Sequence, residues 1–198
     1  MHHLDANNLI IIAAVDFEFS PLKKLFPDAI FFEFGIGALA AAARISAAKS
    51  KFENKDILYI GTAGTFSKFE NVEVVRASTV AWLPTCQRQN LSYSVEKNPL
   101  LTLNSHSQFA SISPRNVVCA PNVSLVDNLP AELTPKNTIE NIELYSVASH
   151  LLPIAKSFTA VLGITNAVGK NSHEQWKANF KTAANEIALT LQNISHTF

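Results

Sequence analysis

Residues 9–15 of the chain are Leu-Ile-Ile-Ile-Ala-Ala-Val, and Asp16-Phe17-Glu18 follow them directly. The run is apolar without interruption and rich in β-branched residues, which is typical of a strand that is covered on both faces. Strands of this kind occur mainly in the parallel sheets of α/β proteins. The stretch therefore predicts a buried strand whose carboxyl end carries acidic side chains.

Further strands and helices are expected to alternate along the chain. The expected strands cover residues 30–34, 56–60 and 158–164, the expected helices cover 38–49, 138–151 and 173–194, and 72–118 is expected to be rich in strands. Two small-residue turns, Gly35-Ile36-Gly37 and Gly61-Thr62-Ala63-Gly64, are expected after the second and third strands. This alternation predicts an α/β fold with a central mixed, largely parallel β-sheet and helices on both faces.

Length and composition indicate one domain and few kinds of partner. The chain has 198 residues, 47% hydrophobic and 16% charged, and shows no linker or repeat, so residues 1–198 are expected to form a single domain. Sixteen Lys and Arg balance sixteen Asp and Glu without a basic run, which disfavours nucleic acid and anionic membranes as partners. Because charge is sparse, we expect apolar surface to be covered in an oligomer.

Metal, cofactor and targeting signals are missing from the sequence. Cys86 and Cys119 lie far apart with no CxxC spacing, and no HExxH, GxSxG or GxxxxGK[ST] motif occurs, so neither a metal nor a cofactor is expected. His150 and His173 are isolated and are expected to be surface or helix-end histidines. No run approaches the 18 to 20 or so apolar residues of a membrane span, and no lysine or arginine precedes the first apolar run. We therefore expect a cytoplasmic protein.

Several motifs occur in an order that resembles one known family. The motifs are Ile12 to Glu18, Gly35-Ile36-Gly37, Ile60-Gly61-Thr62-Ala63-Gly64, Asn141-Ile142-Glu143, and Gly163 to Gly169 with Trp176. In this order they resemble the nucleoside phosphorylase and nucleosidase family, in its hydrolytic branch of methylthioadenosine/adenosylhomocysteine nucleosidases and futalosine hydrolases. The resemblance extends over nearly the whole chain. It implies a small-molecule purine nucleoside as the ligand, and a homodimer.

The resemblance also implies roles for individual residues. Cleavage of an N-glycosidic bond through an oxocarbenium-like transition state needs an activated water, and Glu18 matches the carboxylate that supplies it. Glu143 matches the glutamate that binds the ribose hydroxyls, although its local sequence alone favours a solvated helix start. The other implied substrate contacts are Ile142, Gly64, Ala63 and Phe34.

The nucleophile is expected to be water rather than phosphate. Phosphorolytic members resemble this chain but carry an arginine at the end of the strand that enters the second glycine motif, where it binds phosphate. Here that strand ends in Leu58-Tyr59-Ile60. Arg44 and Arg76 remain as cations that could reach the site from elsewhere in the sequence.

Asn166 bears on the catalytic step and on the purine base. The resemblance aligns Asn166 with an aspartate of the adenine-specific nucleosidases. As an acid, that aspartate can donate a proton to N7 and accept a hydrogen bond from the 6-amino group. Asn166 cannot transfer a proton, but its NH₂ can donate to the N7 and O6 acceptors of a 6-oxopurine. We therefore expect hydrolysis of futalosine or aminodeoxyfutalosine in menaquinone biosynthesis, with Glu18 and Asn166 as catalytic residues. The alternatives are a methylthioadenosine/adenosylhomocysteine nucleosidase and a catalytically silent purine-nucleoside-binding protein.

Overall fold

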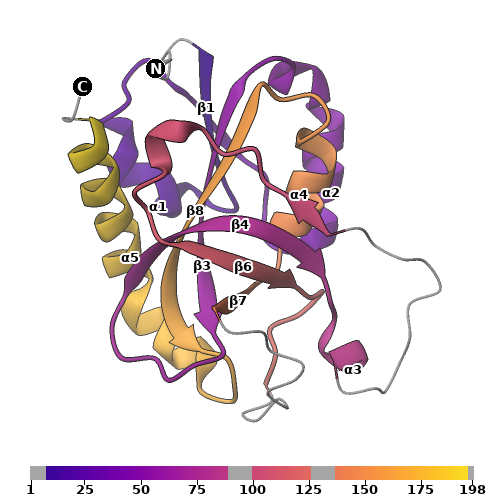
Figure 1. Ribbon diagram of the computed structural model, residues 1–198, viewed down its shortest axis with the longest axis vertical. Helices are drawn as coiled ribbons and strands as arrows, with labels where there is room; N and C mark the ends of the chain where they lie inside the picture. Colours follow the sequence, from indigo (N-terminus) through magenta and orange to yellow (C-terminus); the bar gives the residue numbers. More distant parts are fainter. Residues whose placement is uncertain (1–7, 89–99, 126–136, 196–198) are drawn as a thin grey trace.

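The computed structural model describes residues 8–88, 100–125 and 137–195, and within these ranges eight strands form one mixed sheet (Figure 1). The strands are β1 (Leu9–Ala13), β2 (Ile30–Glu33), β3 (Asp56–Thr65), β4 (Glu73–Trp82), β5 (Leu101–Thr102), β6 (Pro114–Cys119), β7 (Thr138–Asn141) and β8 (Ser157–Ala167). The helices are α1 (Asp16–Phe19), α2 (Ala38–Ala47), α3 (Thr85–Arg88), α4 (Leu144–Leu151) and α5 (Ser172–Ser195), with 3₁₀ turns η2 (Ser20–Lys23), η3 (Lys49–Phe52) and η4 (Ser107–Phe109). The predicted α/β class and mixed sheet are confirmed.

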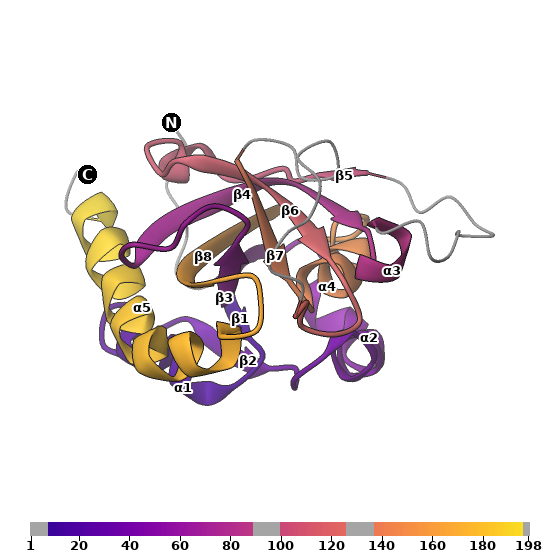
Figure 2. The same cartoon turned by 90° about the horizontal axis from the view of Figure 1, so that it is seen from below.

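The sheet closes on itself, which the sequence did not predict. Strand β3 pairs with β7 and with β8, β7 pairs with β6, β6 with β4, and β4 returns to β8. Figures 1 and 2 show β4 and β6 crossing over β3 and β8 to complete this ring. A closed sheet has an interior in place of a second open face. The prediction of a central sheet flanked by helices on both faces is therefore wrong.

The first strand is buried on both sides, as its sequence predicted. Ile10 and Ile12 of β1 pack into a core cluster with Ala41 of α2, whereas Leu9 and Ile11 pack into a second cluster that includes residues of α5. Figure 1 accordingly shows α2 and α4 on one side of β1 and β3, and α1 and α5 on the other. Alternate side chains of one strand thus anchor both halves of the core.

The second predicted glycine turn is not a turn. Residues 61–64 continue β3, and they pair with β8 over the whole length of the strand and with β7 at its end. Their small size serves packing, since a Cβ on Gly61 would lie 3.0 Å from the Tyr59 ring and one on Gly64 would lie 2.8 Å from Nδ2 of Asn166. Small residues therefore predicted a turn where the strand needs room for its neighbours.

The predicted helix over 138–151 is a strand followed by a helix. Thr138–Asn141 form β7, which pairs in parallel with β6, and α4 begins at Leu144. Oδ1 of Asn141 accepts hydrogen bonds from the backbone N–H groups of Glu143 (2.9 Å) and Leu144 (2.7 Å), so this side chain caps the helix. The strand predicted over 30–34 and the helices predicted over 38–49 and 173–194 are confirmed within a few residues, whereas the strands predicted over 56–60 and 158–164 are longer in the structure. Among the described helices, none is both long and apolar enough to cross a membrane.

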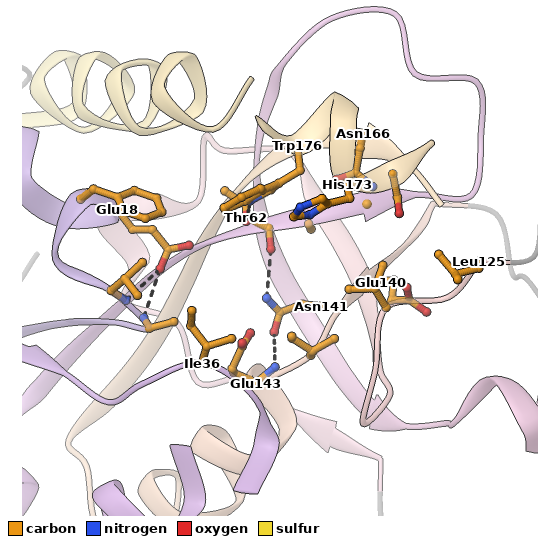
Figure 3. A pocket seen from close by; sticks show the side chains of 18 residues that line it. Glu18, Ile36, Thr62, Leu125, Glu140, Asn141, Glu143, Asn166, His173 and Trp176 are labelled. Carbon is orange, nitrogen blue, oxygen red and sulfur yellow. Dashed lines mark hydrogen bonds between the residues drawn. The ribbon is translucent and has the colours of Figure 1, made fainter. Parts of the chain in front are cut away.

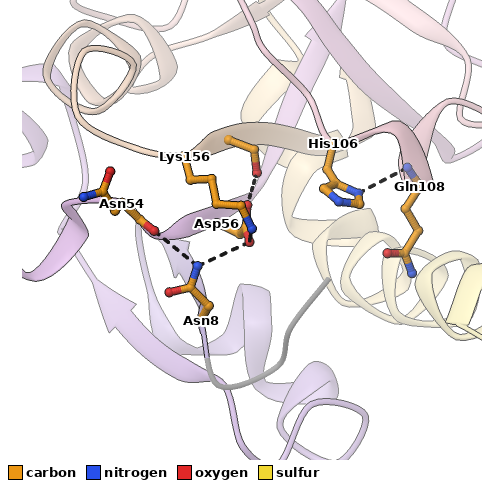
Figure 4. Close-up of polar contacts among 7 residues, drawn as sticks. Asn8, Asn54, Asp56, His106, Gln108 and Lys156 are labelled. Atoms are coloured by element: carbon orange, nitrogen blue, oxygen red, sulfur yellow. Dashed lines mark hydrogen bonds and ion pairs between the residues drawn. The ribbon is translucent and has the colours of Figure 1, made fainter. Parts of the chain in front are cut away.

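A buried carboxylate, that of Asp56, joins the starts of the neighbouring strands β3 and β8. Asp56 accepts hydrogen bonds from Oγ of Ser157 (2.7 Å), Nζ of Lys156 (3.0 Å) and Nδ2 of Asn8 (3.5 Å), as Figure 4 shows. Burial alone would raise the pKa of Asp56, but the bonds from Ser157 and Lys156 outweigh it and lower the pKa. The network holds the start of β3 against the start of β8.

Candidate active site

A cavity of about 550 Å³ opens where the carboxyl ends of β1, β3, β7 and β8 meet. Figure 3 shows side chains from β3, β7, β8, α1 and α5 around it. Of the residues proposed from the sequence, six line the cavity: Glu18, Ala63, Gly64, Ile142, Glu143 and Asn166. The fold therefore gathers motifs that lie far apart in the sequence around one space.

Glu18 lies on α1, in the helical turn that follows β1. Its side chain folds back on the helix start, where Oε2 accepts hydrogen bonds from the backbone N–H groups of Ala14 (3.1 Å) and Val15 (3.4 Å). Only 7% of the residue is exposed. The carboxyl group is thus fixed at the cavity wall, largely out of water.

Glu143 lies at the start of α4, on another wall of the same cavity. Its Oε1 accepts a hydrogen bond of 2.9 Å from the backbone N–H of Gly37, which has a positive φ of 90°. The residue is 6% exposed, so it is not part of a solvated helix start. The first glycine motif therefore donates its N–H to a carboxylate.

Both carboxyl groups have raised pKa values, and Glu143 contributes to that of Glu18. Burial raises the pKa of Glu18 to about 8, and the charge of Glu143 adds to this effect, against opposing hydrogen bonds from backbone N–H groups. Burial likewise raises the pKa of Glu143 to about 7, against the bond from Gly37. Two carboxyl groups with raised pKa values in one cavity are characteristic of sites that move protons or stabilise cations.

Asn166, at the end of β8, has an amide fixed by two hydrogen bonds. Its Oδ1 accepts from Oγ1 of Thr165 (2.8 Å), and its Nδ2 donates to the carbonyl of Ala167 (3.0 Å). The amide lies above Gly64, whose missing side chain provides the room. An amide has further donor and acceptor capacity beyond these two bonds, and the residue lines the cavity.

Sequence reasoning overlooked two polar residues that tie the site together. Nδ2 of Asn141 donates to the carbonyl of Thr62 (3.0 Å), and Oγ1 of Thr62 accepts from Nε1 of Trp176 (3.1 Å). This chain of contacts links β7, β3 and α5 across the cavity. Asn141 is the first residue of the Asn141-Ile142-Glu143 motif. An asparagine just ahead of a helix often caps it, and this signal could have identified Asn141.

Aromatic side chains form one wall of the cavity. The Trp176 ring stacks on Phe180 with centroids 5.1 Å apart, and on His173 with centroids 5.8 Å apart. Phe17 packs edge-on against Phe180 at 4.7 Å. His173 is an exposed residue in the first turn of α5, as predicted, but its side chain also lines the cavity.

Glu140 is a third carboxyl-bearing residue at the cavity, and sequence reasoning did not select it. It lies on β7 and is 5% exposed. Its Oε1 accepts from Oγ of Ser124 at 2.5 Å, and its Oε2 accepts from the backbone N–H of Ser124 at 3.1 Å. These bonds connect β7 to the segment that contributes Val123 and Leu125 to the cavity.

Phe34, proposed as a substrate contact, lies behind the cavity. It is fully buried, is absent from the cavity wall, and stacks on Tyr59 with ring centroids 5.6 Å apart. The residue after the second strand points into the core because the strand is followed at once by the turn of Gly35. Its bulk therefore supports the wall from behind.

The cavity wall is acidic. None of the described residues that line it is a lysine or an arginine, and neither Arg44 nor Arg76 is among them. Within the described ranges no cluster of His, Cys, Asp and Glu side chains has the arrangement of a metal site. The wall therefore suits a neutral ligand or one that develops positive charge.

The fold is similar to that of solved nucleosidase structures. A 5′-methylthioadenosine/S-adenosylhomocysteine nucleosidase mutant of Helicobacter pylori, with 5′-methylthioadenosine in its active site, superposes with a TM-score of 0.77 at 13% identity, over 96% of this chain and 99% of the other. Futalosine hydrolase of Helicobacter pylori gives a TM-score of 0.72 at 14% identity, over 96% and 97% of the two chains.

A further similar structure is the 5′-methylthioadenosine/S-adenosylhomocysteine nucleosidase of Colwellia psychrerythraea in complex with adenine. Its TM-score is 0.73 at 16% identity, over 94% of each chain. No protein-family model and no curated protein sequence matches the chain. The similarity is thus one of fold, at sequence identities that leave the activity to be argued from the site.

Proposed function

We propose that the protein hydrolyses the N-glycosidic bond of a purine nucleoside. The observation that carries the proposal is the pair of buried carboxyl groups, Glu18 and Glu143, which face one cavity and have raised pKa values. The nucleosidase folds to which the chain is similar support the same reaction.

In the proposed mechanism Glu18 is the general base. A carboxyl group with a pKa near 8 is a stronger base than an ordinary glutamate, so its ionised form can take a proton from water as the water attacks the anomeric carbon. Glu143 accepts hydrogen bonds from the ribose hydroxyls, since two carboxylate oxygens match a vicinal diol. Both charges stabilise the oxocarbenium character of the sugar in the transition state.

Asn166 assists the departing base without transferring a proton. An N–H of its amide donates to N7, where negative charge builds up as the glycosidic bond breaks. The bonds to Thr165 and Ala167 hold the amide in place before the reaction. Pre-set donors of this kind stabilise a transition state more effectively than donors that must reorient.

Water is the proposed nucleophile. Phosphate would enter a cavity whose described wall carries three carboxyl groups, on Glu18, Glu140 and Glu143, and no lysine or arginine. A phosphorolytic site needs cations to bind the phosphate.

Futalosine or aminodeoxyfutalosine, as intermediates of menaquinone biosynthesis, are the proposed substrates. The Asn166 amide can donate to N7 of the base in either compound. A catalytically silent nucleoside-binding protein is the second candidate, because Asn166 lacks a transferable proton. One of the similar structures is an aspartate-to-asparagine mutant that has 5′-methylthioadenosine in its active site. Methylthioadenosine nucleosidase activity is the third candidate.

A homodimer is the proposed assembly, and the cytoplasm the proposed location. Ile36, Val123 and Leu125 are exposed apolar residues at the cavity, and Leu39 is an exposed leucine close to Ile36 in the sequence. Association would remove such surface from water. Sedimentation at micromolar concentration should give the mass of two chains, and a single-chain mass would exclude this assembly.

The test of the proposed function is base release from a panel of nucleosides. Futalosine, aminodeoxyfutalosine, 5′-methylthioadenosine and inosine are incubated with the protein, with and without phosphate, and products are separated by chromatography. Free base with free sugar and no phosphate dependence is expected. A sugar phosphate product would show phosphorolysis, and saturable binding without base release would show the silent binding protein.

A further inference from the structure

Glu140 and Asn166 lie on either side of a residue that has no side chain. In the sheet register, Gly64 of β3 pairs directly with Glu140 of β7 and with Asn166 of β8. Side chains of directly paired residues emerge on the same face of a sheet. Because strands are about 4.8 Å apart, the Cα atoms of Glu140 and Asn166 are roughly 10 Å apart, with an open slot over Gly64 between their side chains.

This slot lies at the end of the cavity away from the groups that would hold the sugar. Figure 3 shows Glu18 and Glu143 toward one end of the cavity and Asn166 and Glu140 toward the other. A nucleoside whose ribose lies at Glu143 therefore has its base between Asn166 and Glu140. This placement rests on the proposed function.

The Asn166 amide alone does not choose between purines. N7 is an acceptor in adenine and in 6-oxopurines, and an amide can also pair with either 6-substituent, since it holds both a donor and an acceptor. The two kinds of base differ at N1, which bears a hydrogen in a 6-oxopurine and a lone pair in adenine. The group that faces N1 therefore decides the base.

We propose that Glu140 is this group, a specificity-determining residue that accepts a hydrogen bond from N1–H of a 6-oxopurine. A carboxylate has only acceptors, so it pairs with N1–H and opposes the N1 lone pair of adenine. Glu140 lines the cavity, so a bound base can reach its carboxyl group. The two bonds from Ser124 orient the carboxylate in its buried position.

The consequence is a preference for hypoxanthine nucleosides over their adenine counterparts. Among the proposed substrates, futalosine carries the 6-oxopurine, and aminodeoxyfutalosine carries its 6-amino counterpart. Discrimination of about 10- to 100-fold in kcat/KM is expected, as is usual when a buried polar group is left opposed by the wrong base.

The first test uses 5′-methylthioinosine and 5′-methylthioadenosine, which differ only at the purine. The wild-type protein should prefer the inosine compound, and Glu140→Gln should move the kcat/KM ratio about 10- to 100-fold toward the adenosine compound, because the new amide can donate to N1. Ser124→Ala is the matched control: it removes the Oγ bond to Glu140 but keeps the carboxylate and the backbone N–H bond that orients it, so the preference should keep its direction. An equal loss on both substrates in Glu140→Gln would overturn the proposal.

The second test needs neither a variant nor turnover. Calorimetry on the wild-type protein should show hypoxanthine binding at least about 10-fold more tightly than adenine or 1-methylhypoxanthine, which lacks the N1 hydrogen. Similar affinities for the three bases would overturn the proposal. If the affinities keep the expected order but no nucleoside is cleaved, the role of Glu140 stands and the proposed hydrolysis fails.

Discussion

At the scale of single residues, Glu18 has conflicting requirements. Backbone N–H groups at the start of α1 favour its ionised form, whereas burial and the nearby Glu143 charge favour the protonated form, and the latter effects dominate. Such a group is a good base because its charged form is poorly solvated. The same property makes it costly to the folded protein.

Glu18→Gln should abolish turnover and preserve binding. The amide keeps the size and can still accept the backbone bonds, but it cannot take a proton from water, so kcat should fall on the order of 10²-fold or more. Calorimetric affinity for a purine nucleoside should stay within a few-fold of wild type. A variant with near wild-type kcat would show that Glu18 is not the base.

The acidic limb of the pH profile should depend on Glu143. Because Glu18 must be ionised to act, kcat/KM should rise with pH and level off above the raised pKa near 8. Glu143→Gln removes a charge that raises this pKa, while burial, the larger cause, persists. The limb should therefore move to lower pH in the variant, although not to the pKa of an ordinary glutamate. An unmoved limb would mean that the two carboxyl groups do not interact.

Sequence motifs predicted the cavity residues that directly follow strands. They missed residues whose place in the site depends on strand pairing or on contacts between distant elements. Glu18 and Glu143 were recognised because family motifs surround them. Glu140 lies at the cavity because it pairs with Gly64 of the neighbouring strand, and Thr62 is part of the site because it contacts Trp176 of α5. Neither contact can be predicted from a local sequence pattern. Phe34 was proposed as a contact because it adjoins a motif, yet its side chain points into the core.

At the scale of elements, β3 is the strand on which the candidate site depends. Its small residues allow β7, β8 and the Tyr59 ring to approach closely. The sequence predicted a turn at these residues because Gly and Ala lower strand propensity, and burial in a sheet outweighed that preference. The short β7 was likewise predicted as helix, since four residues give too few periods to separate the two structures.

Gly64→Ala should damage the site more than the fold. The added Cβ would lie 2.8 Å from Nδ2 of Asn166 and 3.1 Å from the Val168 side chain, so the amide must move. We expect kcat/KM to fall at least about 10-fold, with a loss of about 1 to 3 kcal/mol in unfolding free energy.

Gly163→Ala is the control for Gly64→Ala. Its Cβ would lie 2.7 Å from Cβ of Ala183 and so would disturb the packing of α5 on β8. Thermal unfolding and steady-state kinetics on both variants separate the effects. If Gly163→Ala loses as much activity per kcal/mol of stability as Gly64→Ala, displacement of Asn166 is not the cause of the activity lost in Gly64→Ala.

At the scale of the whole molecule, closure of the sheet creates the cavity. The strands whose ends surround it, β1, β3, β7 and β8, are brought together by pairings between segments far apart in the sequence. Alternating elements predicted an α/β protein, but several sheet topologies satisfy the same alternation. Ring closure depends on β3 and β8 being long enough to pair with different neighbours along their lengths, and both were predicted too short.

The stability of the unliganded protein should fall as the pH rises from about 5 to 8.5. The pKa values of Glu18 and Glu143 are raised to about 8 and about 7 in the folded protein, from the ordinary value of 4.5. Between these values the folded state binds more protons than the unfolded state, so their contribution to stability is complete below the unfolded pKa and is lost as the pH passes the folded pKa values.

Because each group loses its contribution over the pH range between its ordinary and its raised pKa, the Tm is expected to be several degrees lower at pH 8.5 than at pH 5. Glu18→Gln removes the larger of the two shifts, because an amide does not titrate. The variant should therefore unfold at a higher temperature than wild type at pH 8.5, and the difference should shrink toward pH 5. Thermal unfolding of both proteins across this range checks the sign directly: a wild-type Tm that rises with pH would show that neither carboxyl group is buried at the cavity as described.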